Sequence, residues 1–221
     1  MATKKEQWEK IKLTSPKFRV SFPKVWPGEQ QDYKGDGKFK YSVDALFSKD
    51  TDLKEMKGAA FALAYKYFGK DKKKWPRAFQ WPFIDGNTKS DLDGYADCVL
   101  VKFKTSAKSA TDAASAPQVI KKVNGEKVRI TQESGEFYAG CYARATITCC
   151  AYKEGSNSGV VFYLGNLCKI AEGKPFSSKE SVDGQFDDVE DTDEDNGSDD
   201  AGNYEDVNHD DKNYGNEDLG Y

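Results

Sequence analysis

The chain has 221 residues, and its formal net charge of −4 is the sum of two parts with charges of opposite sign. Residues 183–221 contain sixteen Asp or Glu and a single Lys, a net charge of −15, so the remainder carries +11. No apolar run approaches the roughly 20 residues of a membrane span, and the N-terminus lacks a secretory signal. We therefore expect a soluble, cytoplasmic protein whose basic part binds a polyanion.

The residue types argue against the common catalytic centres. The one histidine, His209, lies in the acidic segment, which argues against Ser–His or Cys–His catalysis and a His-ligated metal. The five cysteines show no C-x-x-C spacing, so reduced, buried thiols are a better interpretation than a zinc site. We expect no enzyme, no cofactor and no metal.

The first predicted elements are an arm and a strand. Residues 1–16 are polar, and we interpret them as an N-terminal arm, loose or with a short helix. Residues 17–26 alternate apolar and polar side chains, which predicts a strand with Phe18, Val20 and Phe22 on its buried face.

A second strand and a helix follow. Residues 38–47 alternate again, with Lys38 and Lys40 on the outward face. Residues 52–68 place apolar side chains at steps of three and four, which predicts an amphipathic helix, and Gly69 suits its end.

The remaining pattern consists of strands, at residues 95–105, 118–123, 126–131, 140–153 and 159–170. Asn124-Gly125 between the second and third of these is a strong hairpin signal. Without βαβ alternation, we predict a mainly β fold, an OB-fold-like antiparallel barrel with one helix between strands 2 and 3; a β-sandwich is the second choice. The predicted domain covers 17–176, and 177–221 form a disordered acidic tail.

One segment mixes cations with aromatic rings in an irregular loop. It supplies the candidate nucleic-acid-binding residues Lys72, Lys73, Lys74, Trp75, Arg77, Phe79 and Trp81. Base stacking on such rings contributes about 1–3 kcal/mol per base, and lysines add salt-sensitive phosphate contacts. The alternative is that these rings cover one end of the barrel.

Other candidates lie on the outward phase of predicted strands. They are Lys38, Lys40, Lys102, Lys104, Tyr142, Arg144, Tyr152 and Lys153. Cations, hydroxyls and tyrosines on outward faces suit a shallow groove for a sugar-phosphate backbone. An ordinary solvated barrel exterior is the alternative for any single residue.

The tail ends in an acidic run followed by an apolar and an aromatic residue, with Asp218, Leu219 and Tyr221 as candidate partner-binding residues. A segment of net charge −15 can compete with nucleic acid for the basic domain and recruit other proteins. The alternative is a device for solubility.

Several short motifs resemble a family of bacteriophage single-stranded DNA-binding proteins. They are Phe22-Pro23, Asp85-Gly86, Asp93-Gly94-Tyr95, the segment from Phe137 to Arg144, and Asn157-Ser158-Gly159-Val160 leading to Leu164 and Asn166. The resemblance covers about residues 17–176. It implies an OB fold with an acidic tail, and coating of single-stranded DNA in replication, recombination and repair, without catalysis.

Single-stranded DNA is thus the expected partner, together with phage or host replication proteins contacted through the tail; a homodimer is left open. Two alternatives remain. One is a metal-dependent nuclease that uses body carboxylates, with Asp85, Asp91, Asp93 and Asp97 as candidates. The other is a host-interaction protein whose tail mimics DNA.

Overall fold

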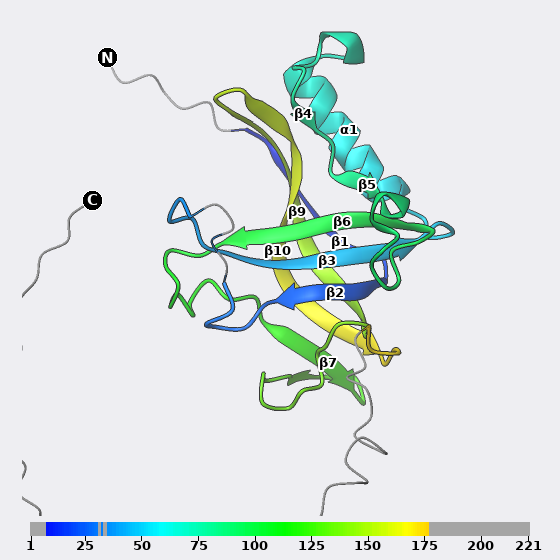
Figure 1. Cartoon of the computed structure of the whole chain (residues 1–221), viewed down its shortest axis with the longest axis vertical. Coiled ribbons are helices and arrows are strands. Elements are labelled where there is room, and N and C mark those ends of the chain that lie inside the picture. Colours follow the sequence, from blue (N-terminus) through cyan, green and yellow to red (C-terminus); the bar gives the residue numbers. More distant parts are fainter. Residues whose placement is uncertain (1–7, 31, 33–34, 177–221) are drawn as a thin grey trace, which may run out of the picture. The chain divides into compact units, whose positions relative to one another are not determined.

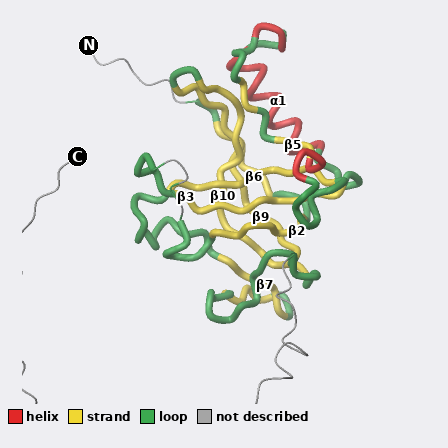
Figure 2. Tube along the Cα trace, in the orientation of Figure 1, coloured by secondary structure: helices red, strands yellow, loops and turns green. Residues whose placement is uncertain are grey.

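The computed structural model describes residues 8–30, 32 and 35–176. The described residues form ten strands, one α-helix and two short 3-10 helices (Figure 1; Figure 2). In chain order these are β1 (Lys10–Thr14), β2 (Phe18–Lys24), β3 (Lys40–Ser48), α1 (Lys54–Phe68), η1 (Lys72–Lys74), β4 (Phe79–Gln80), β5 (Phe83–Asp85), η2 (Gly86–Lys89), β6 (Cys98–Ser106), β7 (Val119–Val123), β8 (Glu126–Arg129), β9 (Tyr142–Glu154) and β10 (Asn157–Ala171).

Five of the strands close into a ring through their hydrogen-bonded pairings. The order around the ring is β9, β2, β3, β6, β10 and back to β9. A closed five-stranded ring is the arrangement of an OB fold. The predicted fold class is confirmed, with α1 between the second and third ring strands. The ring is not wholly antiparallel, because β6 and β10 pair in parallel.

The inside of the ring is filled by alternate residues of each strand. Large rings from Phe18, Phe47, Phe103 and Phe162 meet edge to face, with centroids 5.6–6.4 Å apart. The facing strand β9 contributes small residues, including Ala143, Ala145 and Cys149, all buried. Bulky rings therefore lie opposite small side chains, a size complementarity that close-packed cores require.

Helix α1 contacts β9 and β10 through its buried stripe, which includes Met56, Ala60 and Leu63 (Figure 1). Its N-cap position is Leu53, and the Asp52 carboxylate accepts a hydrogen bond from the Lys54 amide at 2.9 Å. Gly69 has a φ of +83° and ends the helix as predicted. No helix among the described residues is long and apolar enough to cross a membrane.

The predicted arm is partly wrong, because Lys10–Thr14 forms β1 and pairs antiparallel with β9, from Lys10 opposite Cys150 to Thr14 opposite Thr146. The hairpin at Asn124-Gly125 is confirmed: β7 and β8 pair around it, and both turn residues have positive φ, +50° and +87°. The predicted tail over 177–221, with Asp218, Leu219 and Tyr221, lies outside the described residues.

Candidate nucleic-acid interface

A groove of about 480 Å³ lies on the outer face of β2, β3 and β6, the wall that crosses in front of β9 and β1 in Figure 1. Four cations and one exposed ring dominate its lining, which consists of Phe22, Lys24, Ser42, Asp44, Lys89, Leu92, Lys102 and Lys104. The ligand-binding face of OB folds is this same wall of the second and third ring strands.

Strand register explains why these side chains meet. Ser42 on β3 lies opposite Lys104 on β6 and opposite Lys24 on β2. Two residues further along β3, Asp44 lies opposite Lys102. Directly opposed residues point to the same face of a sheet, and side chains alternate with period two, so both rows face outward while Val43 faces the core.

Phe22 reaches the groove because β2 is irregular there. The pairing of β2 with β3 shifts register between Ser21 and Lys24, and Phe22 has a φ of +42°. Its side chain is 55% exposed, and its ring centroid lies 6.4 Å from that of Tyr95. The prediction of a buried Phe22 was therefore wrong, because a bulge reverses the alternation at this residue. A left-handed backbone costs a non-glycine residue about 1–2 kcal/mol.

A buried carboxylate lies beneath the lysines. Asp44 is only 7% exposed; it forms an ion pair with Lys102 at 3.3 Å and accepts a hydrogen bond from the Tyr95 hydroxyl at 3.1 Å. Burial raises the pKa of Tyr95 to about 12; the hydrogen bond with Ser21 opposes this rise, and the negative charge of Asp44 adds to it. Tyr95 is therefore a neutral donor at physiological pH, and it fixes Asp44 in place.

The groove continues along one row of residues toward β1. Lys104 lies opposite Tyr163 on β10, Tyr163 opposite Thr148 on β9, and Thr148 opposite Lys12 on β1. Tyr163 is 41% exposed, and burial of its other side raises the pKa of its hydroxyl. Sequence alternation predicted β10 but singled out neither Tyr163 nor the groove residues Lys24 and Lys89.

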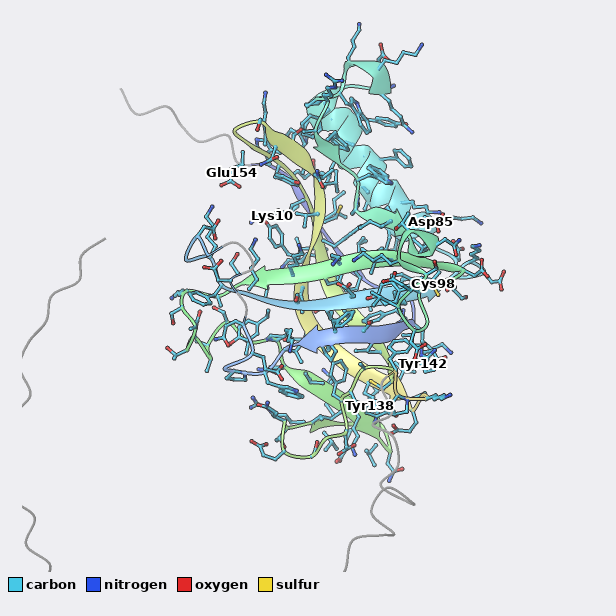
Figure 3. All side chains as sticks on the ribbon, viewed as in Figure 1. Lys10, Asp85, Cys98, Tyr138, Tyr142 and Glu154 are labelled. Carbon is cyan, nitrogen blue, oxygen red and sulfur yellow. The ribbon has the colours of Figure 1, made fainter. Side chains whose placement is uncertain are left out.

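The predicted strand residues fall into two regions. Lys40, Lys102 and Lys104 come from the groove wall, and Lys38 precedes β3 and pairs with Asp36 and Glu154 at 3.6 and 3.9 Å. Tyr152 and Lys153 lie toward the β9–β10 turn, whereas Tyr142 and Arg144 lie at the opposite end of β9. Figure 3 shows this separation, with Glu154 and Tyr142 far apart.

The predicted aromatic segment follows the C-terminal end of α1 and runs back beside the helix through β4 (Figure 1), and none of its residues lines the groove. Trp75, Phe79 and Trp81 contact one another and the α1 rings of Phe61 and Phe68, with centroids 4.4–6.3 Å apart. The neighbouring cations Lys72, Lys73, Lys74 and Arg77 are exposed. The ring contacts favour the packing alternative, and a stacking role here stays a prediction.

Two of the four carboxylates proposed for a nuclease, Asp85 and Asp97, have local structural roles. Asp85 accepts a hydrogen bond from the Asn87 amide at 3.0 Å, and Asp97 forms an ion pair with Lys49. Among the described residues, no three His, Cys, Asp or Glu side chains are grouped so that they could hold a metal ion. The cysteines are unpaired, and burial raises the pKa of Cys149 to about 12.

The closed ring and the basic groove on its outer wall place the chain among OB-fold-like binding proteins. A family model described as "Enterobacter phage Enc34, ssDNA-binding protein" matches residues 10–197. The chain belongs to this family of phage single-stranded DNA-binding proteins, which is not a family of enzymes. The resemblance predicted from the sequence motifs is confirmed.

Individual relatives agree with this assignment. The chain is 30% identical over 176 residues to putative protein p50 of Acyrthosiphon pisum secondary endosymbiont phage 1, covering 76% of this chain and 86% of p50. The single-stranded DNA-binding protein of bacteriophage Enc34, solved in complex with ssDNA, is similar in fold, with 17% identity and a TM-score of 0.55. The match covers 75% of this chain and 89% of the Enc34 chain. The single-stranded DNA-binding protein gp2.5 of bacteriophage T7 is also similar in fold, with 17% identity and a TM-score of 0.52. The match covers 86% of this chain and 98% of the gp2.5 chain.

Proposed function

We propose that this chain binds single-stranded DNA in the groove of β2, β3 and β6 without reading its sequence. The observation that carries the proposal is the presence of an exposed ring, Phe22, among Lys24, Lys89, Lys102 and Lys104 on the ligand-binding wall of an OB-like ring. Single-strand binders combine these two features, a cationic groove and an aromatic platform.

The chemistry of the lining supports sequence-independent binding. Lysine ammonium groups attract phosphates, which every nucleotide carries, and aromatic faces stack on any base. Tyr163 offers a second ring at 41% exposure, one strand beyond Lys104. A strand held by phosphates at the lysines and by bases on Phe22 and Tyr163 is bound tightly with little preference among bases.

We also propose a role for the chain in replication, recombination and repair of phage DNA in the cytoplasm of the host. Its acidic tail competes with DNA for the groove and recruits replication proteins through Asp218, Leu219 and Tyr221. The opposed charges of residues 183–221 and of the remaining chain support this competition.

A fluorescence-anisotropy titration tests the proposal. Labelled oligo-dT and a duplex of the same length are titrated at 50 and 200 mM salt. We expect oligo-dT to bind more tightly than the duplex and to lose affinity steeply with salt. The double variant K24A/K104A should weaken binding, whereas K54A/K57A on α1 removes the same charge from a surface outside the groove and should not. Equal effects of the two double variants would refute the groove assignment.

The tail is tested in the same assay. Removing residues 183–221 should tighten binding of oligo-dT at 50 mM salt, and the gain should shrink at 200 mM because screening weakens the competition. An unchanged affinity at low salt would contradict competition by the tail.

A further inference from the structure

A second set of cations lies on the wall of the ring opposite the groove. The set, called here the second cationic face, consists of Lys10, Lys12, Lys122, Lys127, Arg129 and Arg144. It extends over the outer side of β1, β9, β10, β7 and β8. In Figure 1 the strands β9 and β1 run behind β6 and β3, so this face points away from the groove wall.

Register shows that these side chains share one face. Arg129 on β8 lies opposite Ile120 on β7, Ile120 opposite Cys168 on β10, and Cys168 opposite Arg144 on β9. Three steps between neighbouring strands place Arg129 about 15 Å from Arg144 along this row. Lys127 lies two residues from Arg129, and therefore points to the same side.

The charges on this face are arranged unfavourably for the fold alone. Lys122 and Lys127 lie directly opposite each other across the β7–β8 ribbon, and like charges in that position are destabilising. The other side of the same ribbon is different, because Lys121 pairs with Glu136 at 2.5 Å. Among the described residues, no carboxylate forms an ion pair with any member of the second cationic face.

A hollow of about 640 Å³ lies within this face, over β1 and β9 beside the start of α1. Its lining includes Lys12, Thr14, Arg144, Thr146 and Thr148, with Glu55 as its acidic member. Arg144 is held in place because its Nε donates to the Ser15 carbonyl at 2.9 Å. Cations beside hydroxyls contact phosphate oxygens in protein–DNA complexes.

The second cationic face is joined to the groove. Lys12 belongs to this face and also ends the row that runs from Lys104 through Tyr163 and Thr148. A strand that leaves the groove along this row arrives at Lys12 and the hollow.

We propose that a long single strand, after filling the groove, wraps onto the second cationic face, which holds its phosphates without stacking its bases. This inference rests on the proposed function, since it extends the path of the same ligand. The face offers ammonium, guanidinium and hydroxyl groups, so it recognises the sugar-phosphate backbone and not the bases. Binding there also relieves the repulsion between Lys122 and Lys127.

The test compares oligo-dT of about 8 nucleotides, within the 4–16 that one OB fold covers, with oligo-dT of about 30. The ribbon variant K122A/K127A/R129A and the β1 variant K10A/K12A are measured against the control K54A/K57A/K108A, which removes exposed lysines elsewhere. We expect the ribbon variant to bind the long oligonucleotide about tenfold or more weakly, and its salt slope to fall by about 2, at 0.7 per lost phosphate contact. Its affinity for the short oligonucleotide should equal that of the wild type.

Several results would overturn the wrapping path. They are equal losses for both lengths, no loss for either, or a loss confined to a duplex or to poly-glutamate, which would assign the face to another polyanion. Thermal melting checks folding, and the ribbon variant should melt no lower than the wild type because the removed charges repel. If wild-type protein binds neither oligonucleotide, the proposed function itself fails; if only the length dependence is missing, the groove stands and the wrapping fails.

Discussion

Replacing Phe22 with alanine tests the central element of the groove. The ring is 55% exposed and makes its aromatic contact with Tyr95 at 6.4 Å, so its removal should cost the fold only about 1 kcal/mol. A stacked base contributes about 1–3 kcal/mol, so we expect the affinity for oligo-dT to fall about 5- to 150-fold. Anisotropy measures the affinity, and urea unfolding measures the stability.

Two further substitutions at Phe22 sharpen the test. Phe22→Tyr keeps a ring and should retain affinity. Phe22→Gly removes the ring and also relieves the strain of a φ of +42°. It should therefore bind oligo-dT as weakly as Phe22→Ala, but its unfolding midpoint should lie at a higher urea concentration than that of Phe22→Ala. If Phe22→Ala and Phe22→Tyr bind oligo-dT equally well, the ring does not stack on bases and the reasoning is wrong.

Three other predictions concern charge, pH and packing. In K24A/K104A, the slope of log affinity against log salt should fall by about 1.4, read from titrations at four salt concentrations; an unchanged slope would contradict phosphate contacts. Since the folded state holds the proton of Tyr95 up to about pH 12 while the unfolded state releases it near 10, stability should fall between these values by up to about 2–3 kcal/mol. Urea unfolding at pH 8 and 11 should show about half of this fall, about 1.4 kcal/mol, in the wild type and a smaller one in Tyr95→Phe. Trp81→Ala should lower the free energy of unfolding by about 3 kcal/mol, because its ring packs on Phe61 and Phe83, while the folded protein keeps its affinity for oligo-dT; a loss of affinity without a loss of stability would restore the predicted stacking role.

The strands and the helix were predictable because their patterns are local. Alternation over residues 38–47 located β3 and its outward lysine Lys40, and the Asn124-Gly125 turn located the hairpin. Strand β1 was missed because it has only five residues, with only two apolar side chains, Ile11 and Leu13. Strand β1 forms by pairing with β9, which lies more than 130 residues away in the sequence, so no local pattern indicates it.

The site was less predictable, since it depends on pairings between distant strands. The parallel pairing of β6 with β10 brings Lys104 beside Tyr163, and no local pattern encodes it. The bulge that turns Phe22 outward breaks the period on which the prediction relied. Sequence left two roles open for the rings of Trp75, Phe79 and Trp81, stacking on bases or covering one end of the barrel, because composition does not reveal which rings are exposed; their contacts with one another and with α1 emerge only in the folded chain.

The buried charge of Asp44 constrains how a nucleic acid can lie across this wall. Asp44 is a fixed anion that forms an ion pair with Lys102, and we expect it to repel phosphates and to direct them toward the other lysines of the lining, Lys24, Lys89 and Lys104. In the proposed complex we therefore expect the sugar-phosphate backbone to follow the edges of the groove and the bases to face inward over Phe22. In that arrangement one carboxylate selects which edge of the strand meets the protein, a selectivity that a uniformly basic groove would lack.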